Sequence, residues 1–123
     1  MKKVILDTNF ILSCVRQRID FFEDIKFRGL KILIPTGVIN ELKKLKNSGK
    51  KLHLRNNADL ALKILERSNF ESVDLSLENV DDGLIDFINK NPEVILATLD
   101  RELKRKTKKP KLVIRGKKKL EII

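Results

Sequence analysis

The sequence has a single cysteine and no long apolar run. Its one cysteine, Cys14, cannot form an internal disulfide, which fits a reducing compartment, so we expect a cytoplasmic protein with Cys14 packed in the core. No apolar run approaches the ~20 residues of a membrane span. Only three apolar residues stand between Lys3 and Asp7. We therefore expect neither a membrane segment nor an N-terminal signal.

Tryptophan and tyrosine are absent, and no stretch rich in glycine or serine divides the chain. The 123 residues, 41% of them hydrophobic, predict one domain over residues 1–123 with a substantial core. The six phenylalanines mostly stand at core-spaced positions, so aromatic stacking is expected to contribute little to binding.

Positive charge is in excess, and it is segregated along the chain. The net charge is +10; residues 101–123 carry eleven Lys or Arg against two Glu, and residues 43–55 carry six and no acid. Between them, residues 69–100 carry eight acids against one lysine. An acidic centre between basic segments predicts an enzyme that holds a polyanion against a metal site. The alternative is a solvated, lysine-rich surface, although solubility does not require such segregation.

Short apolar runs alternate with amphipathic stretches along the chain. Residues 4–6 are typical of a strand buried on both faces, and similar runs predict strands at 32–34, 70–75, 94–97, 112–114 and 120–123. Helical spacing predicts helices at 10–12, 16–26, 36–46 with Thr36 as N-cap, 52–67, from the N-cap Asn79 to Asn91, and 99–106. This alternation predicts an α/β fold with a mostly parallel sheet covered on both faces.

Acidic residues follow several of these elements. Asp7 directly follows the strand 4–6, and Asp100 closes the similar run 94–100. Glu41 lies beside the apolar face of the helix 36–46, and Asp81 and Asp82 lie near the start of another helix. Because ligands bind at the carboxyl edge of a parallel sheet, we expect these acids to converge there. Crowded carboxylates repel one another, so a divalent cation with oxygen ligands would account for them.

Each acid also has a simpler interpretation. Asp7 and Asp100 could only cap the helices that follow them. Asp82 could be an acid favoured by the helix dipole, and Glu41 taken alone resembles a surface acid. The sequence does not choose between Asp81 and Asp82.

Four segments together resemble the PIN-domain ribonuclease family in order, spacing and context, over essentially the whole chain. They are Asp-Thr-Asn at 7–9, Glu41 within residues 38–42, the pair Asp81-Asp82, and Thr-Leu-Asp-Arg-Glu-Leu at 98–103. The resemblance implies a three-layer α/β/α sandwich, Mg²⁺ or Mn²⁺, and endonucleolytic cleavage of RNA. Of two candidate branches, the VapC toxins and the rRNA-processing proteins, the double Asp and the basic run after Asp100 resemble the second more closely.

The resemblance also implies roles for individual side chains. The catalytic residues that hold one or two divalent ions would be Asp7, Glu41, Asp82 and Asp100. The residues that orient these carboxylates or a metal-bound water would be Asn9, Thr98 and Asp81. The basic segments supply the expected RNA-binding residues: Lys43, Lys44, Lys46, Lys50, Lys51, Arg55, Arg101, Lys104, Arg105, Lys106, Lys108, Lys109 and Lys111.

The implied partner is RNA, whether rRNA, tRNA or mRNA, and no membrane. A small antitoxin, a ribosome-assembly factor and a homodimer also stay open; exposed Phe residues near Phe21 and Phe22 would permit the dimer. The alternative function is a nuclease-inactive RNA-binding scaffold of the same fold. A phosphoaspartate receiver would need paired acids after the first strand, and a haloacid-dehalogenase-type phosphatase would need an acid where Asn9 stands.

Overall fold

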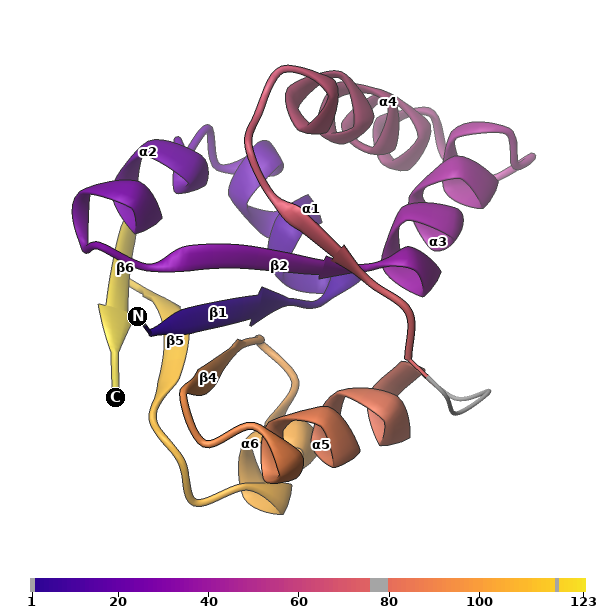
Figure 1. Cartoon of the computed structure of the whole chain (residues 1–123). Coiled ribbons are helices and arrows are strands. Elements are labelled where there is room, and N and C mark those ends of the chain that lie inside the picture. The colour runs from indigo at the N-terminus through magenta and orange to yellow at the C-terminus, as the bar shows by residue number, and fades with distance from the viewer. Residues whose placement is uncertain (1, 76–79, 117) are drawn as a thin grey trace.

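The computed structural model describes residues 2–75, 80–116 and 118–123. In this part of the chain a six-stranded sheet has the order β3-β2-β1-β4-β5-β6 (Figure 1). Strands β1 to β5 are all parallel to one another, and β6 is antiparallel to β5. The strands are β1 Lys3–Leu6, β2 Lys31–Pro35, β3 Glu71–Val73, β4 Val94–Ala97, β5 Lys111–Arg115 and β6 Lys119–Ile122.

Strand β1 lies inside the sheet, paired with β2 on one side and β4 on the other. Its side chains alternate between the two faces. Val4 and Leu6 belong to the larger core cluster, whereas Ile5 belongs to the smaller one, and all three are fully buried. A continuous apolar run is therefore required here, because both faces of the strand are covered by helices.

Helices cover both faces of the sheet. Helices α1 Thr8–Arg16, α2 Phe21–Phe27, α3 Thr36–Lys46 and α4 Leu52–Glu66 supply the larger cluster on one face. Helices α5 Val80–Lys90 and α6 Arg101–Lys106 supply the smaller cluster on the other face. Figure 1 shows these two groups on opposite sides of the strands. The chain is therefore a three-layer α/β/α sandwich with a mostly parallel sheet, which confirms the predicted fold class.

Two details of the predicted helices were wrong. Residues 16–26 do not form one helix: Arg18 has a φ of 59°, a left-handed conformation that ends α1, and Asp20 then caps α2 by accepting the Glu23 N–H at 3.2 Å. Thr36 is the first residue of α3 rather than its cap, because Pro35 occupies the N-cap position. The predicted N-cap Asn79 lies outside the described residues.

The aromatic residues of α2 divide into covered and exposed ones. Phe21 is only 1% exposed, and the partly buried Phe22 contacts it with ring centroids 4.9 Å apart. Phe22 also approaches Phe70 at 6.3 Å. Phe27, at the end of the same helix, is 91% exposed, so an exposed Phe near Phe21 and Phe22 is present, while the dimer itself stays a prediction. Cys14 is fully buried, as predicted. Every helix in the described ranges is too short or too polar to cross a bilayer.

Candidate active site

The predicted acids lie at the carboxyl edge of the sheet. Asp7 directly follows β1, and Asp100 lies three residues after the end of β4. Glu41 lies in the second turn of α3, the helix that follows β2. Asp81 and Asp82 lie in the first turn of α5, whose N-terminal end is on the side toward which β1 and β2 point (Figure 1). The parallel topology brings these four segments to one edge.

Asp7 is the most constrained of these acids. It is 6% exposed, and its Oδ1 accepts the Phe10 N–H at 2.7 Å as the N-cap of α1. Its Oδ2 accepts the Thr98 hydroxyl. Burial raises the pKa of Asp7 to about 6; the Thr98 and Phe10 hydrogen bonds oppose this shift, and the charges of Asp81 and Asp100 add to it.

Thr98 connects the two strand-end acids. Besides donating to Asp7, its Oγ1 accepts the Asp100 N–H at 3.0 Å. Asp100 in turn caps α6: its Oδ1 accepts the Glu102 N–H at 2.8 Å and the Leu103 N–H at 3.4 Å. The capping role foreseen as the alternative is thus real for both Asp7 and Asp100. Capping holds each carboxylate in place, and it is compatible with both carboxylates lying at the same edge of the sheet.

Glu41 and Asp81 extend the acidic cluster to the helices. Partial burial raises the pKa of Glu41, the Thr8 hydroxyl and Lys44 lower it, and Asp81 raises it. The pKa of Asp81 is raised by burial and by Asp100, Asp82 and Glu102, and lowered by Lys106. Asp81 is therefore the acid whose field reaches Asp7 and Glu41, although the resemblance gave the ligand role to Asp82.

Thr8 is a candidate site residue that the sequence reasoning missed. It is 8% exposed and faces Glu41, whose ionised form it favours. Its buried Oγ1 has no partner at hydrogen-bonding geometry in the described part of the chain. A hydroxyl adjacent to the predicted acid Asp7 was the signal that could have identified it.

The donor set fits a hard divalent cation. Carboxylate oxygens and a buried, unsatisfied hydroxyl are oxygen ligands of the kind such ions prefer. The mutual repulsion of the acids is the electrostatic feature that a cation would relieve. Within the described residues, no three His, Cys, Asp or Glu side chains are yet close enough to hold a metal as they stand. Asn9, expected to orient the carboxylates, is exposed in the first turn of α1.

The basic residues divide into two groups. The charge of Lys44 lowers the pKa of Glu41 and the charge of Lys106 lowers the pKa of Asp81, so these two lysines act electrostatically on the acidic cluster. In contrast, Lys46 pairs with Asp59 at 3.2 Å, and the Lys109 ammonium donates to the Ile88 and Asn91 carbonyls. The ammonium groups of these two lysines therefore already contact oxygen atoms of the protein.

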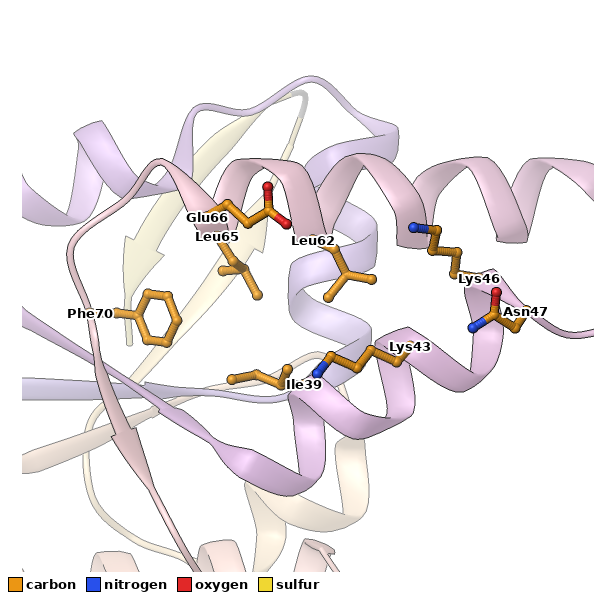
Figure 2. A pocket seen from close by; sticks show the side chains of 8 residues that line it. All are labelled: Ile39, Lys43, Lys46, Asn47, Leu62, Leu65, Glu66 and Phe70. Carbon is orange, nitrogen blue, oxygen red and sulfur yellow. The ribbon is translucent and has the colours of Figure 1, made fainter.

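The most prominent hollows lie away from these acids. A groove of about 500 Å³ runs between α3 and α4, with Ile39, Leu62, Leu65 and Phe70 as apolar lining and Lys43, Lys46, Asn47 and Glu66 as polar lining (Figure 2). A second hollow of about 410 Å³ lies where α1, α2 and α4 meet. None of the predicted acids lines either of these two hollows, so neither hollow belongs to the candidate site.

Comparisons with known proteins agree with this arrangement. The family model described as "PIN like domain" matches residues 4–117. The chain is 31% identical over 129 residues to "Ribonuclease VapC4" of Methanocaldococcus jannaschii, covering 99% of this chain and 97% of that protein. Its fold is similar to that of the PIN domain endonuclease Utp24, with a TM-score of 0.78 and 27% identity over 98% of this chain and 90% of the other.

Proposed function

Because the chain belongs to the PIN-like domain family, whose relatives include a ribonuclease and an endonuclease, we propose that it is a divalent-metal-dependent endoribonuclease. The observation that supports this proposal best is the Thr98 hydroxyl, which joins the caps Asp7 and Asp100 at the carboxyl edge. Fixed carboxylates, of which Asp7 has its pKa raised by the charge of Asp100, are suited to binding a cation against a phosphodiester.

The residues of the site would have different roles, which depend on their positions. The metal would be held by Asp7, Glu41, Asp82 and Asp100, with Asp81, Asn9 and Thr98 orienting the carboxylates or water. When bound, Mg²⁺ or Mn²⁺ supplies a Lewis acid and lowers the pKa of a water molecule. Lys44 and Lys106, whose charges lower the pKa of Glu41 and of Asp81, would hold RNA phosphates next to the scissile one. The chain's own contribution is to orient the carboxylates and to bind the polyanion.

Two alternative biological roles are considered, and one of them is proposed. The relative named as a VapC ribonuclease supports a toxin that cleaves RNA and binds an antitoxin; the fold of Utp24, together with the pair Asp81-Asp82, supports a role in rRNA processing with an assembly factor. We propose the second, with the first as the alternative. Both roles use the same chemistry, and the expected cytoplasmic location stays a prediction.

A cleavage assay tests the proposal. Labelled structured and single-stranded RNAs are incubated with the protein in Mg²⁺ or Mn²⁺, with and without EDTA. The wild type should cut internally, and Asp7→Asn should remove most of the activity. The matched control is Asp86→Asn, because Asp86 lies on α5 but pairs with Lys90 at 3.0 Å on the surface. Binding of RNA without cleavage in any metal would instead support the inactive scaffold.

A further inference from the structure

One lysine joins the loop after α6 to the C-terminal end of α5. The Lys109 ammonium donates hydrogen bonds to the Ile88 carbonyl and, at 3.5 Å, to the Asn91 carbonyl. These carbonyls also accept backbone groups of the turn into β4, the Asn91 N–H at 3.2 Å and the Val94 N–H at 3.0 Å. Lys109 therefore binds the end of α5 and the turn that leads into β4 at the same time.

The loop itself favours this position of Lys109. The Oγ1 of the buried Thr107 accepts the Lys109 N–H at 3.2 Å. Pro110 follows, and the residue before a proline is restricted to extended conformations. A cation at the C-terminal end of α5 also meets the negative end of the helix dipole. Backbone and charge thus both direct the ammonium to the same carbonyls.

Helices α5 and α6 meet at a second place through apolar side chains. Leu103 of α6 is buried in one cluster with Leu84 and Ile88 of α5. Leu84 and Ile88 share this cluster with Ile5 and Leu96 of the sheet, so the core covers one side of α5, but apolar contacts are not directional and leave the helix able to tilt. The hydrogen bonds of Lys109, beyond the end of α6, are directional and add a constraint at the C-terminal end of α5.

The tilt matters because the acids lie at the other end of α5. The first turn of α5 lies about 7 Å along the helix axis from the middle of the Leu84–Ile88 contact, so a tilt of about 10° about that contact moves the first turn by roughly 1 Å. That turn carries Asp81 and Asp82, and Asp100 is the N-cap of α6. The spacing across the acidic cluster therefore depends on how α6 is held against α5.

We propose that Lys109 is a positioning residue, which sets the spacing between the Asp81–Asp82 pair and Asp100 by holding the α6 loop to α5. The inference rests on the proposed nuclease function. It also replaces the expectation that Lys109 contacts RNA phosphate, because its ammonium is already bound by two carbonyls.

Lys109→Met and Lys90→Met form a matched pair. Both remove one positive charge near the C-terminal end of α5, but Lys90 pairs only with Asp86 of its own helix among the described ion pairs. Lys109→Met should lower kcat at saturating RNA by about tenfold or more, since a ~1 Å misplacement can cost 10²-fold. Lys90→Met should leave kcat unchanged. Lys109→Arg should retain most activity, because a guanidinium can donate to both carbonyls.

Two further measurements separate positioning from RNA binding and from the nuclease proposal. In EDTA, the dependence of RNA affinity on salt should be unchanged in Lys109→Met; a slope shallower by about 0.7 would make Lys109 a phosphate contact and overturn the inference. Amide NMR shifts of Gly83 and Leu103 should change in Lys109→Met and not in Lys90→Met. Unchanged shifts also overturn the inference, even if the wild type proves not to cleave RNA. If Lys109→Met does not fold, Thr107→Val replaces it in the same measurements, because it removes the hydroxyl that accepts the Lys109 N–H.

Discussion

At the residue scale, the buried position of Asp7 opposes the ionisation of its carboxyl group when no cation is bound. Its carboxylate must stay buried to cap α1 and to accept the Thr98 hydroxyl, and burial disfavours its charged form. The pKa of Asp7 is therefore about 6 in the folded chain, against an ordinary value of 3.8. Ionisation of this residue should destabilise the metal-free fold.

This shift predicts a specific dependence of stability on pH. Between the two pKa values the folded state binds more protons than the unfolded state, so stability should fall as pH rises from about 4 to about 6. The loss attributable to Asp7 is at most about 3 kcal/mol, from 1.36 kcal/mol per pKa unit. Asp7→Asn keeps an N-cap acceptor and should not show it. Urea unfolding in EDTA at pH 4 and pH 7 measures the difference; identical pH profiles for both proteins would contradict the prediction.

Asp81 and Asp82 are predicted to act differently although they are adjacent. Asp81→Asn should lower the pKa of both Asp7 and Glu41, because the Asp81 charge raises both. Asp82→Asn should leave those two pKa values in place and remove most cleavage, since the resemblance makes Asp82 the ligand. Carbon-detected NMR titration of the carboxyl groups, paired with the cleavage assay, separates the two. If Asp82→Asn cleaves at the wild-type rate, Asp82 is not a ligand.

At the scale of elements, helix α6 combines an acid and a basic surface. Asp100 caps its first turn, and Lys104, Arg105 and Lys106 occupy its last turn. Cations at a helix C-terminus are favoured by the dipole, so these lysines and arginine stabilise the helix. The charge proposed to bind RNA therefore lies on the same helix as Asp100, which is proposed to bind the metal.

Replacing Lys104, Arg105 and Lys106 with Ala should weaken binding of unrelated RNAs about equally. Each lost phosphate contact makes the plot of log affinity against log salt shallower by about 0.7 for a single strand, so the change is up to ~2 units. Fluorescence anisotropy in EDTA at several salt concentrations measures it. The control replaces Lys26, Lys63 and Lys90, the same number of charges on other helices. A loss confined to one RNA sequence would show that α6 reads bases instead.

At the scale of the whole molecule, the acids converge only in the folded chain. A cation that binds the folded state alone stabilises it by mass action, about 2.7 kcal/mol at 100 times its dissociation constant. Millimolar Mn²⁺ should therefore raise the Tm of the wild type by several degrees and that of Asp7→Asn by much less. Thermal melts in Mn²⁺ and in EDTA provide the measurement. An unchanged wild-type Tm would count against a metal site at this edge.

The sheet has an antiparallel edge that a side chain protects. Lys111 and Ile123 exchange N–H···O bonds of 3.0 and 2.8 Å, so in this register the backbone groups of Leu120 face away from β5. Arg28 donates to the Leu120 carbonyl at 2.6 Å while its Nε pairs with Asp24 at 2.6 Å. An unprotected edge strand invites pairing with another chain.

Arg28→Ala should expose that carbonyl and increase self-association. The exposed Ile122 on the same strand would add apolar contact between copies. Light scattering coupled to gel filtration over a range of concentrations measures the effect, with Lys26→Ala as a control on the same helix. Equal masses for the variant and the wild type would show that Arg28 does not protect the edge.

The sequence alone determined the layers and the edge at which the acids meet. A run of apolar residues such as 4–6 leaves a strand few alternatives to burial on both faces, and each strand-end polar residue then has only one edge to occupy. The predicted strands at β1, β2, β4 and β5, the helices α3 and α4, and the buried Cys14 are all confirmed for this reason. Hydrophobic periodicity is a local property, so it can be read from local sequence.

Only the tertiary structure decided which side chains touch. The Thr98 bond to Asp7 joins residues 91 positions apart, the Arg28 bond to Leu120 joins residues 92 apart, and Lys109 reaches back 21 residues to Ile88. The break at Arg18 and the burial of Phe22 beside Phe70 likewise depend on packing between helices. Charge and spacing predicted that acids and lysines would meet. Whether the charge of a given lysine acts on an acid, as that of Lys106 does on Asp81, or binds a helix end, as Lys109 does, depends on distances set by packing, which no local pattern determines.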